Sequence, residues 1–340
     1  MKLEYSGSPH IKNKRTTKGI MIDVCIALLP ALVASIVFFG VNSLLICLIS
    51  VVACVLSEGV YKLALKKDVK TIVKEFDFTS LITGLLLGLN MPPIQAAKYW
   101  YIPLLSGIFA IVVVKMLFGG TGCNIVNPAI AGRVFALMSF TVVMTQSYAI
   151  PNIEALGNAV TGASVTTGAT PLTEFLVTGG SDALQKLGIT ATDLFLGTGI
   201  AGTIGETCKL ALVIGGIYLC VRGVINPLFP LIYVAVTGLF AVMLNGFDFT
   251  AFLPSILSGG LILGAIFMAT DYVTTPTSFL GNVIFFVLLG LLTAGLRAAC
   301  KMEVVSFAIL LCNLLVPLID KFVYPKPFGY VKKNKGGEKK

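Results

Sequence analysis

A loop of small and hydroxyl-bearing residues is the part of this chain best suited to covalent chemistry. Residues 164–172 have the sequence Ser-Val-Thr-Thr-Gly-Ala-Thr-Pro-Leu and lie in a polar interval, residues 145–190, between two series of apolar segments. The glycine and alanine before Thr170 leave the backbone beside its hydroxyl sterically open. Because Ser, Thr, Gly and Pro also cluster in ordinary turns, an acceptor hydroxyl and a plain loop are both compatible with this composition. Lys186 is the only basic residue of the interval, so no basic pocket is predicted there.

A glycine-rich turn is the second candidate for chemistry. Residues 119–122, Gly-Gly-Thr-Gly, are followed by Asn124 and by the pair Asn127-Pro128. Glycine lets a backbone approach a ligand closely, and side-chain amides offer both a donor and an acceptor to the edge of a flat heterocycle. The same residues also suit a helix start, with Asn127 as the N-cap and Pro128 in the first turn. The spacing alone leaves both interpretations open.

Acidic residues inside apolar segments are candidates for an ion pathway, because ionisable groups are rare in membrane spans and usually functional. These residues are Asp23, Glu58, Glu206 and Asp271. Local neutralisation is the alternative, since Lys209 follows Glu206 at a spacing that would place both on one helical face. Lys115 and Arg133 could reach other acids in a similar way.

The composition indicates a membrane protein. The chain has 340 residues, of which 56% are hydrophobic and 12% charged, and its mean hydropathy is +0.93. Soluble domains contain about a quarter charged residues. At about 20 residues per span, the apolar segments predict about ten transmembrane helices, the third of them short: 20–39, 44–62, 78–91, 101–118, 125–144, 194–222 (interrupted by Gly and Thr), 227–245, 254–270, 281–298 and 303–320.

The positive charges predict the orientation of the chain. A net charge of +9 would favour nucleic-acid binding in a soluble protein, but in a membrane protein an excess of Lys and Arg sets the topology. Seventeen of the 25 Lys and Arg residues lie in residues 1–18, 62–74 and 321–340, which share one side if ten spans alternate. That side is expected to be the cytoplasm, so both termini are cytoplasmic and residues 145–190 face outward. The predicted surroundings are the lipid bilayer, with no nucleic acid.

A faint internal repeat organises the apolar segments. Residues 83–88, Thr-Gly-Leu-Leu-Leu-Gly, echo residues 259–264, Gly-Gly-Leu-Ile-Leu-Gly. Each half would contain five spans, an odd number, so the two halves would have opposite orientations in the membrane. Helix breaks at matching positions in the two halves would mark a binding site. Small residues also serve close helix packing, which is the alternative. The predicted organisation is a cytoplasmic segment 1–19, a first repeat 20–144, an outer loop 145–190, a second repeat 191–320 and a basic cytoplasmic tail 321–340.

Several motifs carry a resemblance to a known family. Thr167-Gly168-Ala169-Thr170 resembles the acceptor motif of proteins that carry FMN on a threonine through a phosphoester bond. From Ser-Pro-His at residues 8–10, through the run 119–129, to Thr-Asp at 270–271, the chain is similar to the D subunit of Rnf ion-translocating electron-transport complexes. It is also similar to a relative of that subunit, the B subunit of the sodium-pumping NADH:quinone oxidoreductase. The short ends favour the Rnf subunit.

The resemblance implies a fold and two cofactors. The fold would be that of an all-α polytopic membrane protein with two inverted five-helix repeats, similar to urea and ammonium transporters. FMN would be attached covalently to Thr170, within a loop that contains Thr167, Gly168, Ala169, Pro171 and Leu172. Riboflavin would be held non-covalently on the cytoplasmic side by Gly120, Gly122, Asn124 and Asn127.

The implied function is that of a flavin-carrying subunit, not catalytic by itself, of a redox-driven ion translocase in a bacterial or archaeal cell membrane. Electron transfer between ferredoxin and NAD would drive Na⁺ or H⁺ transport, with a second FMN-carrying subunit and iron–sulfur subunits as partners. The chain has no P-loop, dinucleotide fingerprint or hydrolytic triad. Its eight cysteines form no C-x-x-C pair, so no metal site is predicted. A channel or solute transporter on the same inverted-repeat scaffold is the alternative.

Overall fold

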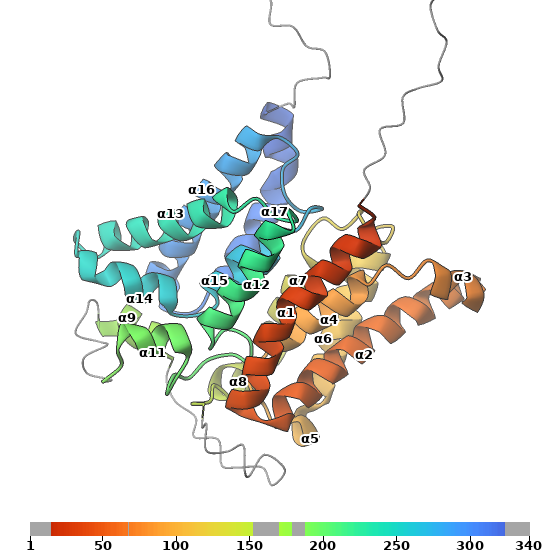
Figure 1. Cartoon of the computed structure of the whole chain (residues 1–340), viewed down its shortest axis with the longest axis horizontal. Coiled ribbons are helices and arrows are strands. Elements are labelled where there is room, and N and C mark those ends of the chain that lie inside the picture. The colour runs from red at the N-terminus through yellow and green to blue at the C-terminus, as the bar shows by residue number, and fades with distance from the viewer. Residues whose placement is uncertain (1–14, 67, 152–169, 179–187, 324–340) are drawn as a thin grey trace, which may run out of the picture.

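The protein is all-helical, apart from one isolated β-bridge between Ala149 and Gly202, in the part of the chain that the structure describes (Figure 1). The structure is a computed structural model and describes residues 15–66, 68–151, 170–178 and 188–323. In these ranges four helices are long and apolar enough to cross a membrane, or five if one bent pair is a single span. The predicted class, an all-α polytopic membrane protein, is confirmed.

The first half of the chain forms a bundle in which α1, α2, α4 and α6 lie together on the right of Figure 1. Gly40, with φ 71°, allows the direct turn from α1 into α2. The apolar helices are α1 (Thr17–Phe39), α2 (Val41–Ala64), α4 (Thr79–Leu89), α6 (Tyr101–Ile108) with its π-helical continuation η1 (Phe109–Met116), and α7 (Pro128–Ser139). The short helices are α3 (Val69–Lys74), α5 (Ala96–Tyr99) and α8 (Thr141–Gln146).

The second half places α13, α14 and α16 on the left of Figure 1, with α12 and α15 nearer the first bundle. Its apolar helices are α12 (Lys209–Val221), α13 (Leu228–Leu244), α14 (Phe252–Leu257), α15 (Leu261–Leu263) with π-helical η4 (Gly264–Met268), α16 (Phe279–Cys300) and α17 (Val305–Phe322). The short elements are α9 (Pro171–Thr178), α11 (Ala191–Leu196) and the 3-10 helix η3 (Phe249–Ala251). The chain bends by 67° between the helical pairs η3–α14 and α15–η4.

Glycines bring α4 into close contact with α2. A Cβ atom on Gly84 would lie 2.5 Å from Val51 Cα, and one on Gly88 would lie 2.7 Å from Cys47 Cα. In the second half, a Cβ atom on Gly264 would lie 2.6 Å from Val305 Cγ1. Small residues allow this kind of approach between membrane helices, so these three glycines of the repeated motif serve helix packing.

Several predicted spans are shorter in the structure than the sequence suggested. The interruption expected within 194–222 is a non-helical segment, residues 197–208, between α11 and α12. Helices α4, α7 and α12 have 11, 12 and 13 residues, which is too short to cross a bilayer alone. The count of ten spans and their arrangement as inverted repeats therefore stay predictions.

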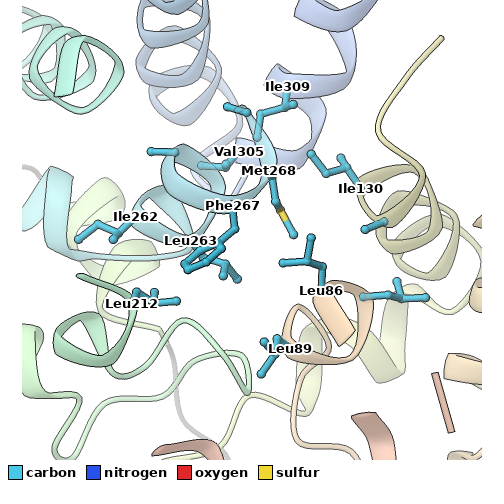
Figure 2. Close-up of a cluster of buried hydrophobic side chains, with 14 of the residues drawn as sticks. Leu86, Leu89, Ile130, Leu212, Ile262, Leu263, Phe267, Met268, Val305 and Ile309 are labelled. Carbon is cyan, nitrogen blue, oxygen red and sulfur yellow. The ribbon is translucent and has the colours of Figure 1, made fainter. Parts of the chain in front are cut away.

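A core of apolar side chains joins the two halves where the short helices meet. Figure 2 shows Leu86 of α4 and Met268 of η4 pointing toward one another, with Phe267 and Leu263 beside them. These residues belong to one buried cluster that also includes side chains of α7, α12 and α17. This apolar core therefore lies between the short helices and separates the region at one end of these helices from the region at the other end.

Candidate functional site

One pocket lies where α4 begins and α12 ends, at the predicted cytoplasmic face, and is called the inner pocket here. It has a volume of about 130 Å³. It brings together the predicted residues Gly122, Asn124, Asn127 and Asp271. The other lining residues are Met21, Val24, Thr79, Ile82, Thr83, Leu86, Lys115, Thr121, Pro128, Ala129, Leu219, Val224, Ile225, Ile266, Phe267, Thr270, Tyr272 and Val273.

The glycine-rich turn forms one wall of the inner pocket. Gly120 and Gly122 have φ values of 95° and 88°, in the left-handed region that residues with a Cβ rarely adopt. Gly120 is buried and does not itself line the pocket, whereas Gly122 does. The sequence spacing therefore correctly indicated a turn that requires glycine.

The two asparagines of this wall have different roles. Asn127 Oδ1 accepts hydrogen bonds from the backbone N–H groups of Ala129 and Ile130, at 3.0 and 3.4 Å. Its Nδ2 donates to the Met268 carbonyl at 3.2 Å. Asn127 thus caps α7 and ties it to η4, as the helix-start interpretation predicted. Asn124 Nδ2 donates to the Val126 carbonyl at 3.0 Å, and its side chain lines the pocket.

A buried ion pair stands at the edge of the inner pocket. Lys115 Nζ lies 2.9 Å from Glu58 Oε2 and donates to Thr79 Oγ1 at 2.5 Å. Glu58 Oε1 pairs with Lys62 at 2.5 Å. The Glu58 carboxylate is therefore neutralised by two ammonium groups, and Lys115 joins it to the pocket lining.

Asp77 links the start of α4 to the glycine-rich turn, a role that sequence reasoning missed. Its carboxylate accepts from the Thr79 hydroxyl at 2.6 Å and from the Thr121 hydroxyl at 2.7 Å. Burial raises the pKa of Asp77, but these hydrogen bonds and the positive charge of Lys115 together outweigh burial and leave the pKa below its ordinary value. The only signal in the sequence was an Asp two residues before a Thr at a helix start.

Two other predicted acids lie near the same end of the molecule. Asp23 of α1 pairs with Arg222 at 3.1 Å and accepts from the Tyr218 hydroxyl at 3.1 Å. Asp271 accepts from the Thr274 hydroxyl at 3.3 Å and lines the inner pocket. Asp23 is thus neutralised between α1 and the end of α12, whereas Asp271 faces the pocket.

A second pocket, called the outer pocket here, lies at the opposite end of α12. It has a volume of about 290 Å³. It brings Thr170, Pro171 and Leu172 together with Glu206. The other lining residues are Leu137, Thr145, Tyr148, Thr173, Ile200, Ala201, Gly202, Thr207, Lys209, Ser258, Gly259, Lys301, Met302 and Glu303. The predicted loop residues Thr167, Gly168 and Ala169 lie outside the described part of the chain.

Thr170 is held in place by the helix that follows it. The Thr170 hydroxyl accepts a 3.3 Å hydrogen bond from the Thr173 backbone N–H, as an N-cap residue does. Pro171 starts α9, and Leu172 and Phe175 are 1% and 2% exposed. Buried anchors on α9 therefore fix the half-buried Thr170 at the edge of the outer pocket.

The pocket around Thr170 contains two lysines that the charges of residues 145–190 did not predict, and two glutamates, Glu206 and Glu303, offset them. Lys209, which is 2% exposed, and Lys301 both line the outer pocket. They come from α12 and from the turn after α16, so the charge count of residues 145–190 could not reveal them. Glu206 lies in a non-helical turn before α12, and its Oε1 accepts from the Thr203 backbone N–H at 3.0 Å. The predicted sharing of one helical face by Glu206 and Lys209 is therefore not observed.

The outer pocket also collects polar atoms without partners. Among the described residues, Glu206 Oε2, Ser258 Oγ and Thr203 Oγ1 are buried and make no hydrogen bond. Glu206 and Ser258 line the pocket, and Thr203 donates its backbone N–H to Glu206. Buried polar atoms are almost always satisfied, so these oxygens indicate that a polar group or water belongs in this space.

The fold and the two pockets define a polytopic helical membrane protein with a pocket at each end of its short central helices. The sequence model of the protein family described as "NQR2, RnfD, RnfE" matches residues 4–329 of this chain. The chain belongs to this family, which confirms its resemblance to the Rnf D subunit.

Named relatives match over nearly the whole chain. The chain is 39% identical over 339 residues to the D subunit of the Na⁺-translocating ferredoxin:NAD⁺ oxidoreductase complex of Acetobacterium woodii, covering 98% of this chain and 97% of the relative. It is 35% identical to the D subunit of the proton-translocating ferredoxin:NAD⁺ oxidoreductase complex of Clostridium ljungdahlii, covering 95% of each. It is 34% identical to the D subunit of the ion-translocating oxidoreductase complex of Alcanivorax borkumensis, covering 99% of each.

Proposed function

We propose that this chain is the flavin-carrying membrane subunit of an Rnf-type ion-translocating ferredoxin:NAD oxidoreductase complex in a bacterial or archaeal cell membrane. The names of the full-length relatives support the complex. The observation that carries the flavin assignment is the Thr170 hydroxyl, fixed beside a pocket that contains the buried Lys209 and unpartnered polar atoms. Bound flavin would supply the electron-transfer chemistry, while the protein sets its position and potential.

The residues of the outer pocket fit an FMN group attached to Thr170. Thr170 precedes the N-terminus of α9, where a phosphate group is stabilised by backbone N–H groups and the helix dipole. Lys209 and Lys301 add positive charge. The unpartnered oxygens of Glu206 and Ser258 are available to hydrogen-bond a ring system. These residues would bind and orient the group.

The residues of the inner pocket fit a non-covalent flavin such as riboflavin. Asn124 and Gly122 line one side, apolar side chains such as Ile82 and Phe267 line much of the rest, and Lys115 and Asp271 add charged groups. An adjoining cavity of about 580 Å³ shares Val224, Ile225, Thr270 and Tyr272 with the pocket. The combined space suits a flat apolar ring with a polar chain, because the adjoining cavity adds Asn226, Thr275, Thr277 and Asn282.

Electron movement between the two faces would be coupled to Na⁺ or H⁺ transport with the other subunits of the complex, including a second FMN-carrying subunit and iron–sulfur subunits. Within this chain, Asp271 and Glu206 are the stronger ion-pathway candidates because each lines a pocket, Asp271 at the inner face and Glu206 at the outer face. They are candidates for ion access at separate faces, not for one path from pocket to pocket. Asp23 and Glu58 are paired with basic side chains. Their contribution is expected to be weaker for that reason.

The attachment is tested by substituting the acceptor threonine. Thr170→Ala should abolish the fluorescent flavin band of the protein after denaturing electrophoresis, because no hydroxyl remains to form the phosphoester. Thr173→Ala, one helical turn away in the same pocket, and Thr167→Ala should retain a fluorescent band. Peptide mass analysis should place the modification on Thr170. A fluorescent band that persists in Thr170→Ala would refute attachment of the flavin to Thr170. A colourless parent protein, produced in a host that has the flavin-attaching enzyme, would favour the channel or transporter alternative.

A further inference from the structure

Three buried residues separate the inner and outer pockets. The inner pocket extends to Leu86 and Phe267, and the outer pocket extends to Leu137 and Lys209. Asn90 after α4 and Arg133 of α7 lie between these limits, and Met268 of η4 contacts Asn90 beside Phe267; the three residues are 1%, 6% and 2% exposed. None of the three belongs to the lining of either pocket. They form the partition between the two spaces.

Hydrogen bonds connect this partition to the wall of the inner pocket. Arg133 NH1 donates to Asn90 Oδ1 at 2.9 Å. Asn90 Nδ2 donates to the Leu86 carbonyl at 2.8 Å and lies 3.6 Å from Met268 Sδ. The Met268 carbonyl accepts from Asn127. The guanidinium is therefore held in a fixed position relative to the ends of α4 and η4.

Arg133 also faces the outer pocket. Tyr148, which lines that pocket, interacts electrostatically with Arg133. A Cβ atom on Gly260 would lie 3.0 Å from Glu206 Oε2 and 3.7 Å from Arg133 NH1, so both groups approach the same point at the start of α15. Arg133 and Glu206 do not form an ion pair within 4.0 Å among the described side chains. Arg133 thus has no direct ion-pair partner among the described residues, and the Glu206 carboxylate lies near it on the outer side.

The surroundings of the partition are apolar. Figure 2 shows Leu86, Leu263 and Phe267 near Met268, with Leu89 farther along beyond Leu86. A cation that moved between the pockets would leave water, enter this apolar layer and approach the guanidinium, and both steps are unfavourable. Arginine stays protonated at any physiological pH, so the repulsion is permanent.

We propose that Arg133 is a fixed positive barrier that prevents cations from leaking between the inner and outer pockets. A positive side chain excludes cations from other membrane pores by the same physical effect. A redox-driven ion pump needs such a seal, because a leak through the flavin-carrying subunit would dissipate the gradient. The role does not depend on which cofactor fills either pocket.

The test measures passive cation entry into vesicles that contain the purified complex, without an electron donor and under an imposed membrane potential. Arg133→Gln removes the charge and keeps an amide near Asn90. Asn90→Asp keeps the shape of the side chain and places a carboxylate against Arg133. This negative charge neutralises the positive charge of the guanidinium. Both variants should increase Na⁺ or H⁺ entry at least tenfold, while chloride entry stays unchanged. Arg133→Lys should be as tight as the parent.

Arg297→Gln is the matched control. Arg297 is also buried, at 3% exposed, but it binds the Ser255 and Ser258 carbonyls and Glu303 at the wall of the outer pocket, and neither Asn90 nor Arg133 is among its hydrogen-bond partners. Vesicles with this variant should stay tight to cations. Equal leaks of cations and chloride, or an equal leak in Arg297→Gln, would show general loosening and overturn the proposal. Parent-like tightness of assembled Asn90→Asp complex would overturn it as well, even if Arg133→Gln did not assemble.

Discussion

At the scale of single residues, the two asparagines of the inner pocket differ in what their substitution can test. Asn127 accepts two hydrogen bonds from the first turn of α7 and donates a third to η4. Loss of an N-cap costs about 1 kcal/mol of stability, so replacing Asn127 by Ala would disturb the helix as well as the pocket. Asn124 bonds only locally, to the Val126 carbonyl, and is the cleaner position for a binding test.

We predict that Asn124→Ala lowers the riboflavin extracted from the purified protein several-fold and leaves the covalent flavin band intact. The reason is that Asn124 lines the inner pocket, whereas Thr170 lies at the other end of α12. Asn127→Asp, which keeps the capping oxygen, is the control for changes in this turn. Unchanged riboflavin in Asn124→Ala, measured by chromatography of the acid extract, would show that this amide does not hold the ligand.

The residues that sequence reasoning identified are those whose roles are local. Gly120 and Gly122 were recognisable because a turn of this kind requires positive φ values, and Asn127 because a cap sits beside the helix it caps. Lys115 meets Glu58 across 57 positions of the chain. Lys209 reaches the outer pocket from another helix. Contacts of this range depend on how the helices pack, which the residue pattern does not specify.

At the scale of elements, the contact between α2 and α4 depends on the absence of side chains. The backbones of the two helices approach so closely at Gly84 and Gly88 that a methyl group would overlap Val51 and Cys47. Gly59 of α2 provides the contrast, because a Cβ atom there would have no heavy atom within 4 Å. The same substitution therefore has opposite consequences at the two positions.

Gly84→Ala should destabilise the protein by about 1–3 kcal/mol, the usual penalty for overpacking a close-packed interior. Gly59→Ala should be neutral or stabilising by up to about 1 kcal/mol, because alanine is the better helix former. Thermal unfolding of the two variants in the same detergent measures the difference. Similar midpoints for both would mean that α2 and α4 are not in the close contact described.

The sequence predicted most elements but not how continuous they are. Apolar segments identified the helices because burial in lipid requires them. The break at residues 197–208, with Gly197 and Gly199 at φ 85° and 68°, was foreseen only as an interruption. The length of this break depends on the buried turn that carries Glu206. Contacts with α4 hold that turn in place, because the Gly205 backbone N–H donates to the Leu89 carbonyl at 2.7 Å.

At the scale of the whole molecule, the distribution of basic residues predicts the topology. The three lysine- and arginine-rich stretches of the sequence would all face the cytoplasm. A reporter fused after Lys340 should be active in the cytoplasm, and one inserted at Asn158 should report the outside. Both positions lie outside the described residues. A cytoplasmic signal from the Asn158 insertion would contradict the predicted number of spans and with it the outward position of the Thr170 loop.

The shortness of α12 has an electrical consequence. With 13 residues, it separates the two pockets by roughly 20 Å, compared with about 30 Å for the hydrocarbon core of a bilayer. The membrane voltage then falls across a thinner layer, and the electric field there is about half again as strong as in the surrounding lipid. An electron that passes from one pocket to the other crosses most of this voltage, which corresponds to about 2.3 kcal/mol per 100 mV. With flavins in both pockets, as proposed, the energised membrane would act directly on the electron distribution between the two ends of this helix.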